Sequence, residues 1–403
     1  MTERRQRVPD VFDEAHRRCH AGEPVALATV VATWHSAPQP PGTTMLVAAD
    51  GTVTGSVSGG CVEADLYERA RRVLATGAPE LIRYGISDDD AYAVGLTCGG
   101  VLDVFVERVD PGALPGLDAV AAARRAAQPA AVVTCVAADA GGAPNDAENP
   151  LGGNSPGTPP TDPARRLGRR LVLTGGQHSI GSLGDDRLDD AASADALGLL
   201  AAGHSGMLRY GYSGQRRGSG VSLFVTAYAT PPRMIVFGAI DFAAAVARIG
   251  AFLGYRVTVC DARPVFTTVR RFPEADEVVV QWPHRYLRTE VDAGRVDERT
   301  VVCVLTHDPR FDVPLLELAL RHPLAYVGAM GSRRTHDDRL KLLGEAGLTD
   351  AQLARLASPI GLDLGGRTPE ETAVSVAAQI VAARWGGTGL PLAALDGPIH
   401  RPG

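Results

Sequence analysis

Short apolar runs bounded by turn residues recur along the whole chain, and after residue 231 they alternate with helix-like segments. In this last part the expected strands lie at 233–237, 256–260, 277–281, 301–306 and 324–327. The expected helices lie at 242–253, from 313 onward and from 369 onward. Strands that alternate with helices predict an α/β fold with a doubly wound, Rossmann-like parallel sheet.

Two stretches interrupt this pattern. Residues 139–165 are dominated by Gly, Pro, Asn, Asp, Ala and Thr without apolar periodicity, which predicts a mobile loop. Pro231 and Pro232 prevent continued strand pairing just before a strongly apolar run. The sequence therefore predicts an N-terminal domain at 1–230 and a C-terminal domain at 231–403.

The N-terminal part contains an internal repeat. Each copy reads as a strand, a strand pair, a helix and further strands, which predicts two related α+β lobes at about 20–110 and 125–230. The aligned segments are 24–32 with 129–137, 46–47 with 171–172, 55–57 with 181–183, 83–85 with 209–211, and 101–106 with 221–226.

The two copies differ at their cysteines. Cys61 aligns with Arg187, and Cys98 aligns with Gly218. If both cysteines only filled a core, small apolar residues would be expected at these positions of the second copy, and arginine is a poor substitute. The first lobe is therefore predicted to carry the chemistry.

Composition narrows the class of protein. The chain has 403 residues, of which 45% are hydrophobic and 21% charged, as in ordinary globular proteins. No apolar run approaches the ~20 residues of a membrane span, and the charged N-terminus does not resemble a secretory signal. The net charge of −6 with scattered basic residues argues against nucleic acid as a partner. Six cysteines suit reduced thiols in the cytoplasm.

The segment 58–63 ends a strand and opens a helix expected at 62–74. Gly59 and Gly60 would let a ligand approach the backbone, and free amides at a helix start favour an anion and the thiolate form of Cys61. We include Glu63 in this candidate site. A turn followed by a buried cysteine is an equally good interpretation.

A second cysteine stands beside a glycine pair: Cys98 precedes Gly99 and Gly100 before a strand. Thiols at Cys61 and Cys98 could converge on one soft ligand. Two cysteines cannot close a structural zinc site, so zinc is not favoured.

The first strand of the C-terminal part is followed by a defective dinucleotide motif. Gly238 is present, but Ile240 replaces the glycine that lets a pyrophosphate contact the backbone, and Ala243 occupies the third position. Asp261 lies at about the spacing of a ribose-binding acid. Binding of NAD(P) is therefore doubtful.

Polar residues also follow the next two strands, where doubly wound sheets bind ligands. His307 and Asp308 could transfer a proton or orient a polar group, although a turn is the commoner role of such a pair. Gly331, Ser332 and Arg333, followed by Arg334, would suit an anionic ligand. The plain alternative is a solvated helix start.

A glycine-rich loop at 359–368 leads into the last helix. Thr368, Pro369 and Glu371 predict a capped helix start. Asp363 and Arg367 remain candidates for ligand contact.

Together, the segments 58–63, 95–100, 326–334 and 359–371 resemble the XdhC/CoxI family of molybdenum-hydroxylase maturation factors. The resemblance covers most of the chain. It implies a protein that binds a molybdopterin-type molybdenum cofactor, assists its sulfuration by a cysteine desulfurase, and delivers it to a xanthine dehydrogenase or carbon monoxide dehydrogenase.

The same resemblance implies that Cys61 and Cys98 lie near the cofactor, with molybdenum held only through it, and that the α/β part helps to hold its phosphate or a nucleotide. We expect a homodimeric accessory protein rather than a stand-alone enzyme. An NAD(P)-dependent oxidoreductase and a non-catalytic interaction protein with structural cysteines are the alternatives.

Overall fold

The computed structural model describes residues 10–34, 39–85, 100–138, 163–175, 178–216, 220–306 and 308–396. They form two compact units, one ending at Thr230 and the other spanning 231–396. None of the helices in the described ranges is long and apolar enough to cross a membrane.

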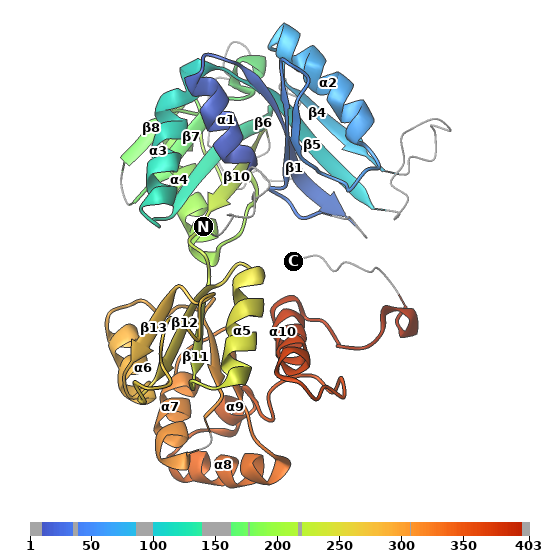
Figure 1. The fold of residues 1–403 in the computed structure, drawn as a ribbon. Coiled ribbons are helices and arrows are strands. Elements are labelled where there is room, and N and C mark those ends of the chain that lie inside the picture. The colour runs from blue at the N-terminus through green and yellow to red at the C-terminus, as the bar shows by residue number, and fades with distance from the viewer. Residues whose placement is uncertain are drawn as a thin grey trace. The chain divides into compact units, whose positions relative to one another are not determined.

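The N-terminal unit repeats one arrangement of elements twice (Figure 1). The first lobe consists of α1 (Val11–His20), β1 (Val25–Trp34), β2 (Thr44–Ala48), β3 (Val53–Gly55), α2 (Glu63–Thr76), β4 (Glu80–Tyr84) and β5 (Val101–Val109). The second consists of α3 (Leu114–Arg125), β6 (Ala130–Ala138), β7 (Arg170–Thr174), β8 (His178–Gly181), α4 (Asp186–Ala202), β9 (Gly206–Tyr210) and β10 (Val221–Tyr228). A short 3₁₀ turn, Pro111–Ala113, leads into α3.

Both lobes contain a five-stranded antiparallel sheet with the same strand order, β3-β2-β1-β5-β4 in the first and β8-β7-β6-β10-β9 in the second. The predicted pair of related lobes is therefore confirmed. Even an irregularity is repeated, because the β1–β5 register shifts at Val31 and the β6–β10 register shifts at Val136.

The strand pairing corrects two parts of the sequence alignment by one residue. Leu27 pairs with Leu46 while the matching Val132 pairs with Val172, so Leu46 corresponds to Val172 and not to Leu171. Likewise, Ala28 pairs with Val106 while the matching Val133 pairs with Val225, so the segment 101–106 corresponds to 220–225. The alignment slipped because both registers give an equally apolar match, but a one-residue slip turns every side chain to the opposite face of a sheet.

Alternation along the strands gives each sheet two buried faces. In the first lobe Ala26, Ala28 and Val30 pack with α2 on one face. On the opposite face Val31 and Phe105 meet the corresponding Val136 and Phe224 of the second lobe. The two lobes thus share a core made of equivalent residues.

Part of the predicted loop at 139–165 is ordered. Residues 139–162 lie outside the described residues, but Pro163–Arg166 form a 3₁₀ turn. The residues that follow this turn pair with β6, since the Gly168 amide donates to the Cys135 carbonyl and the Cys135 amide donates to the Arg169 carbonyl.

The C-terminal unit is a six-stranded parallel sheet in the order β13-β12-β11-β14-β15-β16, as expected for a Rossmann-like fold. Its strands are β11 (Arg233–Phe237), β12 (Arg256–Asp261), β13 (Glu277–Val280), β14 (Val301–Val304), β15 (Tyr326–Ala329) and β16 (Leu356–Ala357). Its helices are α5 (Asp241–Phe252), α6 (Pro283–Asp292), α7 (Pro309–Arg321), α8 (Arg333–Glu345), α9 (Asp350–Leu353) and α10 (Pro369–Trp385), followed by a 3₁₀ turn (Leu392–Ala394).

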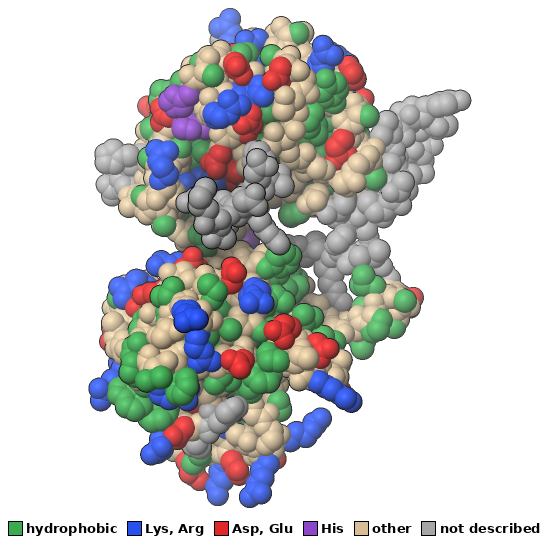
Figure 2. All heavy atoms as spheres, viewed as in Figure 1, with side chains coloured by type: hydrophobic (Ala, Val, Ile, Leu, Met, Phe, Trp, Pro, Cys, Tyr) green, Lys and Arg blue, Asp and Glu red, His purple; other side chains and the backbone are tan. Residues whose placement is uncertain are grey.

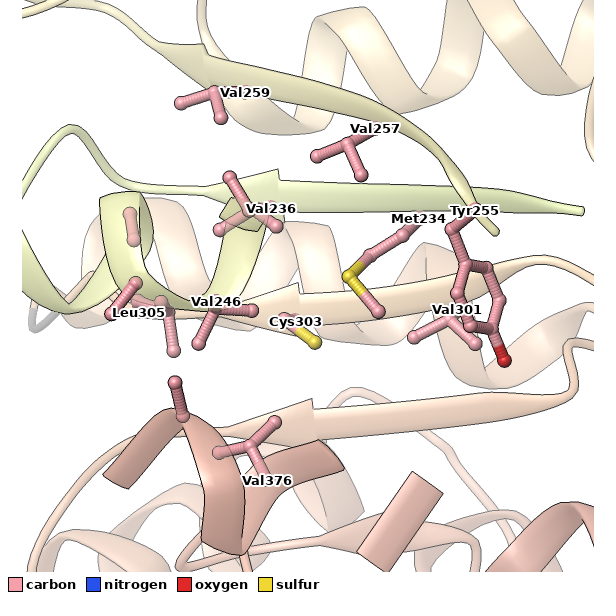
Figure 3. Close-up of a cluster of buried hydrophobic side chains, with 14 of the residues drawn as sticks. Met234, Val236, Val246, Tyr255, Val257, Val259, Val301, Cys303, Leu305 and Val376 are labelled. Atoms are coloured by element: carbon pink, nitrogen blue, oxygen red, sulfur yellow. The ribbon is translucent and has the colours of Figure 1, made fainter. Parts of the chain in front are cut away.

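Helices cover both faces of this sheet, so its strands are apolar on both sides. Met234 and Val236 of β11 point to the face covered by α5 and α10, which Figure 3 shows with Val246 of α5 and Val376 of α10. Ile235 and Phe237 point to the opposite core, which contains residues of α6 and α7. This alternation explains the unbroken apolar runs in the sequence.

Candidate functional site

The segment 58–62 of the first lobe is an irregular loop between β3 and α2. Gly59 and Gly60 adopt φ angles of +80° and +122°, which L side chains rarely adopt. A Cβ atom at either position would meet no other atom within 4 Å. Backbone conformation, not crowding, therefore requires glycine here.

The carboxylate of Glu63 holds this loop in place. Its oxygens accept hydrogen bonds from the Ser56 and Ser58 hydroxyls at 2.6 and 2.5 Å. They also accept from the backbone amides of Ser58, Gly59 and Gly60 at 2.8, 3.1 and 2.9 Å. The expectation of free amides is therefore wrong, because the chain supplies its own anion to them.

These contacts also determine the charge of Glu63. Partial burial acts to raise its pKa, but the hydrogen bonds from Ser56 and Ser58 outweigh burial and lower the pKa to about 2. Glu63 is thus ionised at neutral pH, and its role here is to shape the loop.

Cys61 is the residue that this loop presents. Its amide donates to the Ser58 hydroxyl at 2.9 Å, and its partly exposed side chain packs at the edge of the first lobe's core. It precedes the first residue of α2 by two positions, close to the helix N-terminus.

The other described cysteines are buried. Burial raises the pKa of Cys135 to about 11 and the pKa values of Cys260 and Cys303 to about 12, and it also raises the pKa of Cys19. Such thiols stay protonated and are shielded from reagents. Among the described cysteines, Cys61 is thus the one suited to chemistry at the surface.

The second lobe has a different structure at the matching position. There α4 begins at Asp186, so Arg187, the counterpart of Cys61, lies within the helix. One element of the loop is retained, because Asp189 accepts from the amide of Leu183 at 2.8 Å, as Glu63 does from Val57 at 3.2 Å. The first lobe therefore has a glycine loop that carries a thiol where the second lobe has a helical turn.

Cys98 and Gly99 lie outside the described residues, and Gly100 is buried directly before β5. The convergence of Cys61 and Cys98 therefore stays a prediction.

In the C-terminal unit the strand order reverses between β11 and β14, which places a candidate site at the carboxyl ends of these strands. Gly238 has a φ of +117°, and a Cβ there would lie 3.1 Å from the backbone of Leu305. Ala243 is fully buried against the sheet, so it serves the packing role of a third glycine. Ile240 is half-buried at the start of α5.

Asp261 is occupied by contacts within the chain. One oxygen accepts from the Ala239 amide at 2.7 Å, and Arg263 donates to both oxygens at 3.0 and 2.7 Å. Burial acts to raise the pKa of Asp261, but the hydrogen bonds from Arg263 and Ala239 lower it overall. A ribose would have to displace these contacts.

The remaining candidates follow β14 and β15, which are neighbours in the sheet. His307 lies outside the described residues. Asp308 caps α7 by accepting from the Arg310 amide and pairs with the Arg310 side chain at 2.6 Å. Ser332 caps α8 by accepting from the Thr335 amide at 3.1 Å. Both residues thus start helices.

The structure brings further candidates to the carboxyl edge of the same sheet. Gly331 is half-buried, while the Arg333 and Arg334 side chains are exposed at the start of α8. Neither guanidinium forms a hydrogen bond or ion pair with another residue in the described ranges, so both can meet an anion. Thr368 and Glu371 form the predicted capping box of α10, and Asp363 and Arg367 are exposed in the loop before it.

Sequence reasoning missed a cavity of about 530 Å³ between the two sheets of the N-terminal unit. Phe105 and Phe224 are among its lining residues, and so are Glu107 and Arg170, which form an ion pair at 2.7 Å. Its volume suits a small ligand. Because its lining comes from both copies of the repeat, no local motif marked it.

Two descriptions of protein families match this chain. Residues 19–85 and 162–211 match the XdhC and CoxI family, and residues 234–380 match the XdhC Rossmann domain. This chain belongs to the XdhC and CoxI family. The matched segments include the loop at 58–62 that carries Cys61, which we call the Cys61 loop. They also include the carboxyl ends of β11, β14 and β15, whereas Cys98 falls outside them.

Two relatives of this XdhC-family chain can be aligned with it in sequence over most of its length. It is 26% identical over 364 residues to a Bacillus subtilis protein named as a probable xanthine dehydrogenase subunit, covering 90% of this chain and 94% of that protein. It is 24% identical over 364 residues to the molybdenum cofactor insertion chaperone PaoD of Escherichia coli, covering 90% and 85% of the two chains.

A solved structure supports the fold. A crystal structure described as a xanthine dehydrogenase from Bacillus halodurans superposes with a TM-score of 0.61 at 23% sequence identity. The match covers 92% of this chain and 94% of that one.

Proposed function

We propose that this chain is a maturation factor for a molybdenum hydroxylase, which binds the molybdenum cofactor and inserts it into an enzyme of the xanthine dehydrogenase or carbon monoxide dehydrogenase type. The family and the relative that bears the name of a cofactor insertion chaperone support this role. The observation that carries it is the Cys61 loop, in which a thiol is presented by one lobe and absent from its duplicate.

The residues available fit such a ligand in chemical terms. Thiolate sulfur is a soft donor of the kind that suits the metal end of the cofactor, and Cys61 is the described thiol at the surface. An anionic phosphate would suit Gly331 and Arg333 at the start of α8. The amides of Gly59 and Gly60 are not part of this assignment, because Glu63 already occupies them.

The finer parts of the proposal concern partners. We propose that Cys98 joins Cys61 at the cofactor, that a cysteine desulfurase supplies the sulfur, and that the chain acts in the cytoplasm as a homodimer. These parts depend on the family resemblance.

Cofactor binding by variant proteins tests the central claim. Cys61→Ala should weaken binding of molybdenum cofactor by at least about tenfold, because a metal-directed thiol is lost. Arg187→Ala is the matched control, since it changes the equivalent position of the second lobe, and it should leave the affinity unchanged. Equal affinities of wild type and Cys61→Ala would contradict the thiol role.

The strand order of the C-terminal unit also keeps an NAD(P)-dependent activity as a second candidate. The internal contacts of Asp261 and the presence of Ile240 weigh against it. Titration with NAD(P)H decides between the two: no binding at millimolar concentration removes this candidate, and micromolar binding would restore it.

A further inference from the structure

Two histidines and an aspartate meet where the first helices of the two lobes touch. His16 and His20 are on α1, and Asp118 is on α3. Asp118 Oδ1 lies 2.8 Å from His16 Nε2 and 2.7 Å from His20 Nε2. Figure 2 shows histidine side chains gathered on this exposed face of the N-terminal unit.

The geometry of this group would suit a metal ion. Histidines four residues apart lie on one face of a helix, the spacing by which helices present two imidazoles to one ion. Here both Nε2 atoms point to the same carboxylate oxygen, and the three ligand atoms lie within 4.8 Å of one another. No other group of this kind occurs in the ranges that the structure describes.

The surrounding residues hold the group in a form that can bind a cation. Asp118 is exposed, so an ion from solvent can reach its carboxylate. Phe12 stacks on the His16 ring with an interplanar angle of 9°. Arg17, the nearest arginine in sequence, is engaged with Glu14 at 2.6 Å, which reduces its repulsion of an incoming ion.

We propose that His16, His20 and Asp118 bind one first-row divalent metal ion such as Zn²⁺. Imidazole nitrogen and carboxylate oxygen are the donors that such ions prefer, and three protein ligands leave a fourth position for water or an added ligand. The ion displaces the hydrogen bonds to Asp118. Each imidazole then carries its proton on Nδ1, so that its Nε2 atom offers a lone pair to the ion. The ion thereby joins α1 of the first lobe to α3 of the second.

This link has a structural consequence for the unit. Phe12 of α1 and Leu117 of α3 both line the cavity between the sheets. An ion bound by both helices would join the two elements that line this side of the cavity. Its binding should therefore stabilise the folded N-terminal unit.

Titration of the full-length, chelator-treated protein with Co²⁺ and Zn²⁺ tests the proposal. We expect one Co²⁺ per chain at micromolar concentration, with the weak visible absorption of nitrogen and oxygen ligands and without the intense near-ultraviolet bands of thiolate ligands. Zn²⁺ should displace the Co²⁺ and raise the melting temperature.

Two variants keep the hydrogen bonds while removing ligands. His20→Gln retains an N–H donor toward Asp118, and Asp118→Asn retains an oxygen acceptor, so each should fold but lose at least about tenfold in metal affinity. His204→Gln changes an exposed histidine of the same unit and should bind metal as wild type does. The proposal would be overturned if both ligand variants bound metal with wild-type affinity. It would also be overturned if the Co²⁺ spectrum showed thiolate bands, or if the wild type bound no metal at micromolar concentration.

Discussion

Glu63 illustrates how one side chain can determine what a loop is able to bind. Its carboxylate accepts from two hydroxyls and from consecutive amides, which together form the kind of concave donor set that otherwise captures phosphate. As a consequence, the loop leaves Cys61 partly exposed, while the amides of Gly59 and Gly60 are bound to Glu63.

Replacement of Glu63 tests this internal anion. Glu63→Gln should lower the free energy of unfolding by about 1.5–3 kcal/mol at neutral pH, because hydrogen bonds to a charged acceptor are lost and an amide N–H group faces other donors. Chemical denaturation measures the difference, and Glu68→Gln on the exposed side of α2 is the control.

The difference in the free energy of unfolding between wild type and Glu63→Gln should also depend on pH. The pKa of Glu63 is about 2 in the folded protein against an ordinary value of 4.5, so the carboxylate contributes stability above pH 4.5 and loses that contribution as the pH falls toward about 2. The gap between wild type and Glu63→Gln should therefore shrink in acid. A gap that stays constant with pH would contradict the assignment.

At the residue scale the sequence located candidates better than it assigned their roles. The glycine–cysteine loop at 58–63 was identified from residue types alone. The contacts of Glu63, and the pairing of Asp261 with Arg263, depend on which donors the folded backbone brings within 3 Å. That information is absent from a local pattern.

At the scale of elements, the hairpins β2–β3 and β7–β8 both end at a glycine, Gly55 and Gly181. Gly55 and Gly181 have φ angles of +83° and +89°, and a Cβ at either position would overlap the carbonyl oxygen of the facing strand, that of Thr44 or of Arg170. The two lobes therefore need the same glycine for the same reason.

Alanine substitutions at these hairpins should be unusually costly. Gly55→Ala and Gly181→Ala each combine about 1–3 kcal/mol of backbone strain with the overlap. Gly22→Ala, at a φ of +80° with open space around it, isolates the strain and should cost less. Thermal or chemical unfolding gives the comparison, and equal losses at all three sites would show that the overlap relaxes freely.

Element boundaries were predictable where caps or prolines mark them. The helix start at Thr368 and Pro369 is an example, and β11 was predicted at its observed bounds. Other boundaries moved: β15 begins at Tyr326, two residues beyond the expected start, and α7 begins at Pro309, four residues before Val313. Asp308 caps α7, but its sequence context was equally that of a turn.

For the whole molecule, each unit has its own core. The clusters around Met234 and Ile235 draw only on residues of 231–396. Sequence patterns predicted the parallel sheet, since its strands are apolar on both faces. They could not predict the shared core of the two lobes, in which equivalent residues such as Val31 and Val136 come from segments more than a hundred residues apart.

A fragment spanning 231–396 should fold by itself. We expect cooperative unfolding at a temperature that matches one transition of the full chain. Its two cysteines, Cys260 and Cys303, are buried, so thiol reagents should label neither before unfolding. Rapid labelling of the fragment under native conditions would mean that its core depends on the rest of the chain.

The matched bulges at Val31 and Val136 bear on how this protein arose. Because Val31 and Phe105 rest on their own counterparts, one lobe supplies the complement of the other. A gene encoding a single lobe would therefore have made a protein that pairs with itself about a two-fold axis. In this chain the two lobes are covalently joined, so they need not be identical, and a thiol at position 61 can be present in one lobe alone.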